Sequence, residues 1–126
     1  MRTIKFRGKR LFSNDWEYGN LIQRPDGANF IETGDLRICP VQDFTIGQFT
    51  GLLDKNGKEI YEGDIVQSVR YKDFVYKVAY DQRFASFCLD REQDMYKHYF
   101  GEAVEAENCE VIGNIHDNPE LLKNND

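Results

Sequence analysis

Apolar and polar residues alternate along several short runs in the second half of the chain. The clearest run places Phe74, Tyr76, Val78 and Tyr80 on one face of an extended backbone, opposite Lys77. Alternation with a period of two is typical of a strand that turns one face toward the core. The strands predicted in this way cover residues 65–72, 74–80, 84–89 and 111–115. With the hairpin before them they make about five short strands, the number of a small β-barrel, whose closed sheet has no free edges.

These strands follow a stretch, residues 51–66, in which every bend carries the residue type that it needs. Asn56-Gly57 accepts two successive residues with positive φ at low steric cost, so a tight turn is predicted there. Gly63 and Asp64 break the chain again, because glycine frees the backbone and an aspartate side chain accepts hydrogen bonds from nearby amides. We therefore expect a strand, a turn, a short strand, a kink and a longer strand, with Gly63 at a backbone angle that a β-carbon would strain.

Strand and turn signals also alternate through the first half of the chain. Residues 3–8, 16–23 and 28–32 have strand character, and clusters of Gly, Pro, Asn and Asp separate them. These patterns predict a β-rich N-terminal annex over residues 1–50. The SH3-like β-barrel domain is expected over residues 51–126, with a short C-terminal turn, and the two parts are expected to pack as a single compact unit.

Two segments depart from the strand pattern. Met95 and Tyr99 fall at helical spacing, after acidic residues that favour a first helical turn, so one short helix is predicted near residues 90–99. Asn118-Pro119 resembles a helix N-cap followed by the first helical position, and predicts one helical turn after it. The predicted fold class is therefore mainly β, with little helix.

Composition adds limits on the class of protein and its location. Of the 126 residues, 40% are apolar and 30% are charged, as in ordinary globular proteins. No apolar run approaches the roughly 20 residues that span a bilayer, and no apolar segment follows the basic N-terminus as in a secretory signal. We therefore expect no membrane contact and a cytoplasmic location, with free thiols at the widely spaced Cys39, Cys88 and Cys109.

Residue types found in catalytic centres are present, but their spacing matches no catalytic or metal-binding motif. The serines lack a Gly-x-Ser-x-Gly context, and no glycine-rich phosphate loop occurs. The cysteines and the two histidines lack metal-ligand spacing, so no metal and no cofactor are expected. The best carboxylate candidates are Glu59, Glu62 and Asp64, which we interpret as turn residues. We therefore expect no enzymatic activity.

Charge is unevenly distributed along the chain, whose net charge is −6. The first ten residues hold five bases and no acid: Arg2, Lys5, Arg7, Lys9 and Arg10. Two interpretations stay open. In the first, the basic strand and the acidic C-terminal part attract one another or only solubilise their own faces. In the second, the basic strand binds nucleic acid together with aromatic residues of the barrel. The acidic balance, and an alternation that places most of these aromatics in the core, favour the first interpretation.

Two longer motifs resemble one protein family. Residues 50–66 and 110–122 are similar, in order and in separation, to the signatures of the YopX family of small phage and prophage proteins. Residues 4–7 also fit the opening strand of that family. The resemblance implies an SH3-type barrel for the second part of the chain. The family carries no established activity. The resemblance therefore indicates a related family but implies no mechanism of action.

The function expected from these patterns is that of a non-enzymatic protein-interaction module. Its partner is an unknown protein or, in a homo-oligomer, a second copy of the chain. The alternative is a nucleic-acid-binding small β-barrel that uses the basic N-terminal strand. The candidate binding residues are Arg2, Lys5 and Arg7 in that strand, with Tyr61 and Asp64 in the stretch of residues 51–66.

Overall fold

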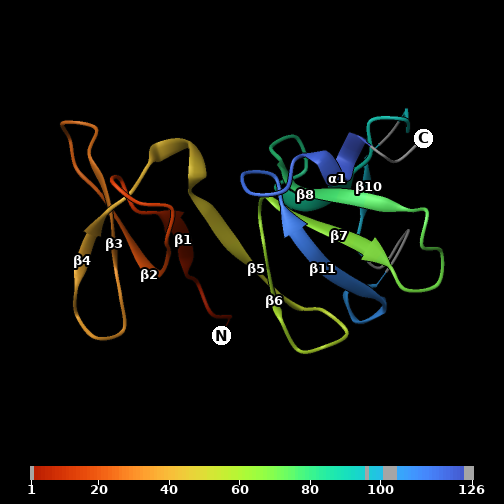
Figure 1. Ribbon diagram of the computed structural model, residues 1–126, viewed down its shortest axis with the longest axis horizontal. Helices are drawn as coiled ribbons and strands as arrows, with labels where there is room; N and C mark the ends of the chain where they lie inside the picture. Colours follow the sequence, from red (N-terminus) through yellow and green to blue (C-terminus); the bar gives the residue numbers. More distant parts are fainter. Residues whose placement is uncertain (1, 96, 101–104, 124–126) are drawn as a thin grey trace. The chain divides into compact units, whose positions relative to one another are not determined.

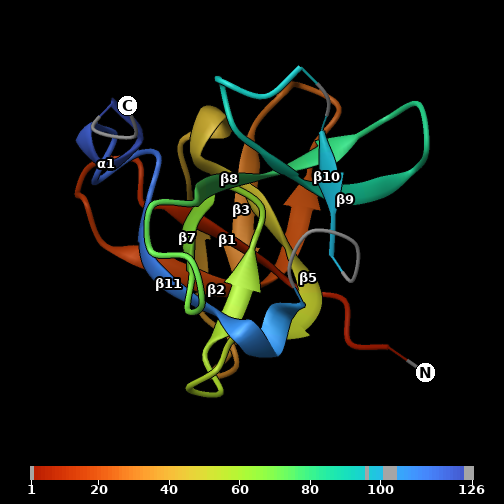
Figure 2. The ribbon, with the colours of Figure 1, turned by 90° about the vertical axis from the view of Figure 1, so that its right-hand side faces the viewer.

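The computed structural model describes residues 2–95, 97–100 and 105–123. Figure 1 shows their elements along the chain, and Figure 2 shows the same ribbon turned by 90°. The predicted mainly β fold is confirmed, because antiparallel strands carry the described structure. The elements are β1 (Phe6–Lys9), β2 (Trp16–Gln23), β3 (Asn29–Glu32), β4 (Ile38–Pro40), η1 (Asp43–Thr45), β5 (Gly47–Leu53), β6 (Glu59–Tyr61), β7 (Asp64–Ser68), β8 (Val75–Asp81), β9 (Ser86–Asp90), β10 (His98–Tyr99), η2 (Ala106–Asn108), β11 (Cys109–Asn114) and α1 (Glu120–Lys123).

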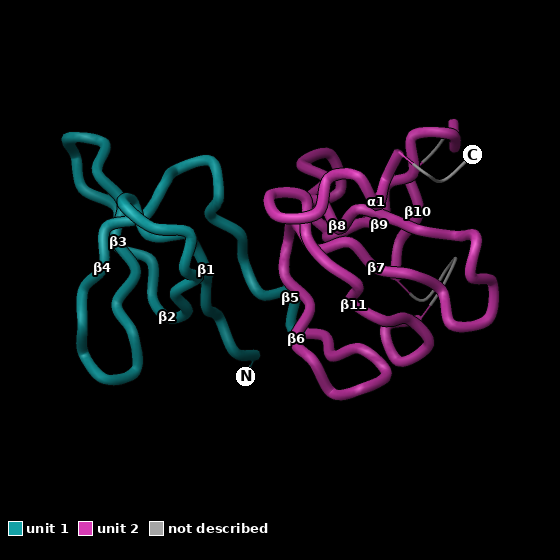
Figure 3. Tube along the Cα trace, viewed as in Figure 1, with its two compact units in different colours: residues 1–51 teal, residues 52–126 magenta. Residues whose placement is uncertain are grey.

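The chain divides into two compact units, residues 1–51 (unit 1) and residues 52–126 (unit 2), coloured teal and magenta in Figure 3. Within unit 1 the strand order is β4-β3-β2-β1-β5, all antiparallel. Ile31 in β3 and Cys39 in β4 are buried partners in this sheet. β5 runs past the boundary, and its last two residues lead into the turn before β6.

The basic strand β1 lies between β2 and β5 and is largely covered. Arg7 and Lys9 are buried, with 5% and 8% of their surface exposed. The Arg7 Cζ lies 4.6 Å from the ring centroid of Trp16, and the Lys9 Nζ lies 5.6 Å from it. These cations pack on the aromatic ring of the neighbouring strand, so the aliphatic parts of both side chains contribute to the core.

Unit 2 contains a five-stranded antiparallel sheet with the order β10-β9-β8-β7-β11. Its core is one cluster of buried side chains: Ile60, Val66, Tyr76, Val78, Leu89 and Cys109. The pairings of the described strands give an open order, so the closed barrel stays a prediction. α1 follows β11, as the Asn118-Pro119 pattern predicted.

Residues 51–66 form most of the bends that their residue types predict. Gly57 and Gly63 have φ values of +78° and +95°, which confirms the expected positive-φ kink at Gly63. Asn56, however, does not have positive φ, because the Asp54 carboxylate accepts its N–H at 2.8 Å and holds it in an Asx turn. Asp64 caps the second bend by accepting the N–H of Tyr61 at 2.7 Å.

The short helix predicted near residues 90–99 is wrong for the described part of that segment. β9 continues to Asp90, a turn follows, and His98 and Tyr99 then pair with β9 as β10. Asp94 does not serve a helix start, because its carboxylate binds His98 instead. Pairing with the sheet therefore outweighs a weak helical pattern. Residue 96 lies outside the described residues.

The expectation that most barrel aromatics fill the core is also wrong. Tyr76 is buried, whereas 55% of Tyr71, 41% of Phe74 and 42% of Tyr80 is exposed. Tyr71 and Phe74 lie in the loop between β7 and β8, where the alternation of a strand does not apply. Tyr80 is the last residue but one of β8 and is not part of the core cluster.

Candidate functional site

Asp94 joins two side chains on the segment between β9 and β10. Its Oδ2 atom lies 2.8 Å from Nε2 of His98 and 3.5 Å from Nε of Arg91. The main-chain N–H of Asp94 donates to the Arg91 carbonyl at 3.0 Å, which forms the turn that brings the three residues together. All three side chains are only partly exposed, so this Arg91–Asp94–His98 group is held in a partly desolvated position.

On one side of this group lies a hollow of about 280 Å³, here called the aromatic hollow. Its lining residues are Ser68, Tyr71, Phe74, Tyr76, Arg91, Asp94 and His98. The Tyr71 and Phe74 ring centroids are 5.6 Å apart, and the Arg91 Cζ lies 4.7 Å from the Phe74 ring centroid. Tyr76 meets His98 edge to face at 6.0 Å. The aromatic rings therefore support one another around the opening.

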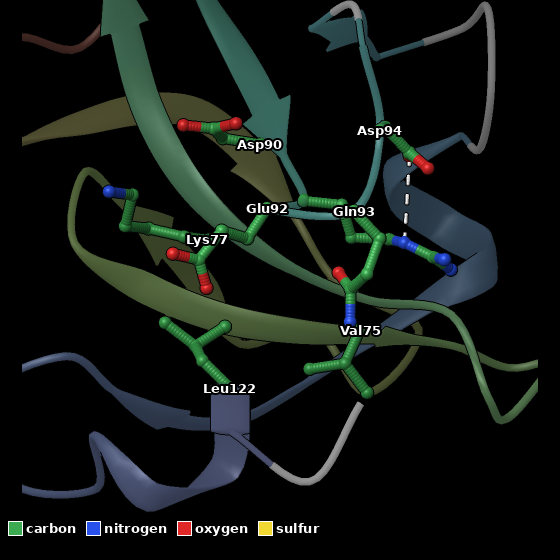
Figure 4. A pocket seen from close by; sticks show the side chains of 8 residues that line it. Val75, Lys77, Asp90, Glu92, Gln93, Asp94 and Leu122 are labelled. Carbon is green, nitrogen blue, oxygen red and sulfur yellow. Dashed lines mark ion pairs between the residues drawn. The ribbon is translucent and has the colours of Figure 1, made fainter. Parts of the chain in front are cut away.

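On the other side lies a larger hollow of about 490 Å³, here called the charged hollow and drawn in Figure 4. Its lining residues are Val75, Lys77, Asp90, Arg91, Glu92, Gln93, Asp94 and Leu122. Carboxylates outnumber cations in this lining, and Val75 and Leu122 supply apolar surface. Figure 4 shows the Glu92 side chain extending into the hollow between Lys77 and Leu122. The hollow therefore combines an apolar wall with a local excess of negative charge.

Tyr76, which lines the aromatic hollow, has a raised pKa. Burial raises the pKa of Tyr76, the opposite effect of Arg91 does not cancel this rise, and Asp94 adds to it. The phenol therefore stays protonated at neutral pH and keeps its O–H as a hydrogen-bond donor.

Serine, histidine and aspartate all line the aromatic hollow, but they are not arranged as a hydrolytic triad. The Ser68 Oγ accepts the N–H of Tyr71 at 3.0 Å. The Nε2 of His98 is engaged with Asp94, so that nitrogen does not face the serine hydroxyl as a base would. The arrangement offers aromatic rings, polar groups and charged side chains, which are the parts of a recognition site.

The basic residues predicted for binding all lie in unit 1. Arg2 is exposed, Lys5 is half-buried with its Nζ 5.4 Å from the Phe49 ring centroid, and Arg7 is buried against Trp16. These three residues therefore do not form one exposed basic face, and their role in binding stays a prediction.

Tyr61 and Asp64, the other two predicted binding residues, lie in unit 2 and are each 2% exposed. Their contact through the Tyr61 N–H and the Asp64 carboxylate stabilises the bend before β7. Neither lines the hollows, and a binding role for them also stays a prediction.

Sequence reasoning missed Arg91, Asp94 and His98 as a group. Their spacing of three and four residues was a usable signal, but it was interpreted as part of a helix. Val75 and Leu122 gave no local signal, because strand pairing and α1 bring together residues that are distant in the sequence.

The described residues hold neither a metal-ligand cluster nor a membrane-spanning helix. Within residues 2–95, 97–100 and 105–123, no group of three or more His, Cys, Asp or Glu side chains is placed to hold a metal ion. Over the same ranges, no helix is both long enough and apolar enough to cross a membrane.

Comparisons with known proteins give one matching family and a similar solved structure. The family described as YopX protein matches residues 5–123. The crystal structure of protein EF1440 from Enterococcus faecalis is similar at 26% sequence identity and a TM-score of 0.61. That likeness covers 97% of this chain and 99% of that chain, so both units take part in it. No curated protein matches the sequence.

Proposed function

The chain belongs to the YopX family, and from this premise we propose that it is a non-enzymatic protein-interaction module. Its contact surface is the aromatic hollow of unit 2, and its partner is another protein. A phage or prophage origin, a cytoplasmic location in the host cell and an SH3-like barrel in unit 2 are parts of the same proposal.

The observation that carries the proposal is the exposed pair Tyr71 and Phe74. The Arg70 Cζ lies 5.6 Å from the Tyr71 ring centroid, and the Arg91 Cζ lies 4.7 Å from that of Phe74. Aromatic residues and arginine are enriched where protein interfaces carry most of their binding energy. Rings already supported by stacking lose less side-chain entropy when a partner binds, which favours affinity.

The absence of a nucleophile–base contact in the aromatic hollow supports the non-enzymatic part. Nucleophilic catalysis requires a base within hydrogen-bond reach of the nucleophile. In the described residues of the hollow, the hydrogen bonds of Ser68 and His98 are directed to Tyr71 and Asp94. Binding, rather than bond cleavage, is the chemistry that these groups favour.

The positions of the basic residues support a protein partner over nucleic acid. Arg7 and Lys9 are buried on Trp16, and the chain carries a net charge of −6. Contacts with phosphates require cations that reach the backbone of the nucleic acid. Aromatic rings with stacked arginines can also stack bases, so nucleic acid is retained as an outcome of the test.

The test compares the full chain with a Tyr71→Ala/Phe74→Ala double variant as baits in a bacterial lysate, read by quantitative mass spectrometry. A matched control is Phe84→Ala, because Phe84 is 60% exposed and carries a stacked arginine at 5.0 Å, yet does not line the hollow. We expect a protein that the wild type and the control capture and that the double variant loses at least tenfold.

Two further measurements identify the class of partner. The mass in solution reports binding to a second copy, and fluorescence anisotropy with labelled DNA and RNA at two salt concentrations reports nucleic acid. A monomer that captures no protein in a variant-dependent way contradicts the proposal. Salt-sensitive binding of an oligonucleotide that the double variant abolishes would replace the protein partner with nucleic acid.

A further inference from the structure

The two hollows of unit 2 share the Arg91–Asp94 pair, which lines both of them. One extended segment of a partner that crosses this pair can therefore place side chains on both sides of it. The chemistry of each hollow then indicates which side chains fit.

The aromatic hollow suits one flat side chain. Its volume of about 280 Å³ lies just below the range of roughly 300–1,000 Å³ that holds drug-sized ligands. Its walls include Tyr71, Phe74 and Tyr76, which favour stacked or edge-to-face contact with another ring.

The charged hollow suits a long basic side chain. Asp94 is already balanced by Arg91, and Lys77 lies opposite Asp90 in the pairing of β8 with β9. The lining as a whole holds three carboxylates and two cations, so one negative charge is in excess. Glu92 is exposed and extends into the hollow, so its carboxylate is placed to meet an incoming cation (Figure 4).

An apolar wall completes the fit. Val75 and Leu122 face the same hollow as Glu92. Lysine and arginine cover apolar surface with their methylene stems while the charged end stays in a polar position. A basic side chain laid along Val75 and Leu122 can thus bring its cation to the Glu92 carboxylate.

We propose that the two hollows form one bipartite site for a segment of a partner protein that carries an aromatic side chain close to a lysine or arginine. The ring enters the aromatic hollow, and the basic side chain enters the charged hollow. This inference rests on the proposed function and adds the chemistry of the partner.

The test uses acetylated and amidated peptides of the form Tyr-(Gly)n-Lys, with zero to three glycines, titrated into the ¹⁵N-labelled full chain. Matched peptides replace either Tyr by Ala or Lys by norleucine, which keeps the apolar stem. We expect the best Tyr–Lys peptide to bind at least tenfold more tightly than both matched peptides. Its chemical-shift changes should include amides of both hollows, such as those of Phe74 and Glu92.

Variants assign each half of the peptide to its hollow. Glu92→Gln should lower the affinity of the Tyr–Lys peptide to that of the norleucine peptide, without changing the latter. Phe74→Ala should weaken both peptides. Asp15→Asn, at an exposed acid of unit 1, is the control and should change neither.

The outcomes separate this inference from the function on which it rests. Equal affinities for the Tyr–Lys and norleucine peptides, or shift changes confined to residues outside the hollows, overturn the bipartite site. If Glu92→Gln leaves capture of a partner unchanged while Tyr71→Ala/Phe74→Ala abolishes it, the interaction function stands and the bipartite site is wrong. Displacement of the peptide by a short oligonucleotide but not by the captured partner also overturns it.

Discussion

The Oδ2 atom of Asp54 accepts the main-chain N–H of Val111 at 2.9 Å, across 57 positions of sequence. The Oδ1 atom of the same carboxylate accepts the N–H groups of Asn56 and Lys58 at 2.8 and 2.9 Å. One buried side chain therefore closes the turn before β6 and also fixes β11. Burial acts to raise the pKa of Asp54, but the three N–H donors outweigh it and the pKa lies below its ordinary value.

Replacing this carboxylate should destabilise unit 2. In Asp54→Asn the side chain keeps one oxygen acceptor and presents an NH₂ group to one of the main-chain donors. We expect a loss of about 1–3 kcal/mol in the free energy of unfolding at pH 7. Urea denaturation followed by circular dichroism measures it. Asp26→Asn is the control, because Asp26 is exposed and accepts only the Ala28 N–H among the hydrogen bonds of the described residues, so its effect should be much smaller.

The lowered pKa of Asp54 also predicts how stability depends on acid. The folded pKa lies below the unfolded value of about 3.9, so the contribution of this group is present above that pH. It is lost as the pH falls through the folded pKa. The difference in stability between the wild type and Asp54→Asn should therefore be full at pH 7 and shrink below about pH 4. A difference that stays constant from pH 7 to pH 3 would contradict this assignment.

Tyr99 should titrate late in alkali. Its O–H donates to the Asp81 carboxylate at 2.7 Å, and this bond raises its pKa to about 12. The folded value lies above the unfolded value of about 10, so the stabilising contribution is present below pH 10 and is lost as the pH rises toward 12. Absorbance of the phenolate measures the titration. Tyr99→Phe should remove one late-titrating phenol from the absorbance titration.

Gly19 should not tolerate a side chain. Its φ is +154°, and a β-carbon there would overlap the carbonyl oxygen of Glu32 in the neighbouring strand. Because the obstacle is backbone, β2 and β3 must separate locally. We expect Gly19→Ala to cost about 2–4 kcal/mol of stability, measured by thermal or urea unfolding. Gly34→Ala is the control, since a β-carbon there meets no atom within 4 Å. Equal stabilities of the two variants would refute this close approach.

Gly63 is the second position at which the backbone requires a glycine. Its φ of +95° strains any residue with a β-carbon, and its N–H donates to the Val78 carbonyl at 2.8 Å. Gly63→Val should therefore lower the free energy of unfolding by roughly 1–3 kcal/mol. An unchanged melting temperature in that variant would show that the kink can form with ordinary backbone angles.

The parts of the fold that the sequence predicted correctly depend on local chemistry. The turn at Asp54 and Gly57, the kink at Gly63 and the strand around Val78 each follow from residue types within a few positions. Such features are decided by backbone sterics and by short-range hydrogen bonds, which a single sequence contains.

The errors arose where distant residues decide the outcome. Tyr99 has helical spacing relative to Met95, but pairing with Cys88 across β9 and β10 makes it a strand residue. Arg7 has the type of a surface residue, but Trp16 on the neighbouring strand covers it. Neither contact leaves a local pattern in the sequence.

The candidate site could not be predicted from the sequence for the same reason. Arg91 and Asp94 could be recognised as an ion pair from their spacing. The hollows on either side of them require Phe74 and Val75 from one segment and Leu122 from the end of the described chain. Only the folded arrangement shows that these residues share a surface.

The late position of β11 in the sequence has a consequence for synthesis on the ribosome. Unit 1 is complete once residue 51 has emerged, but Cys109 in β11 pairs with Ser68 in β7 and is buried in the core of unit 2. During translation, β7 is therefore synthesised well before β11, the strand that pairs with it. A chain truncated before Cys109 lacks that strand and leaves a strand edge of unit 2 open to aggregation.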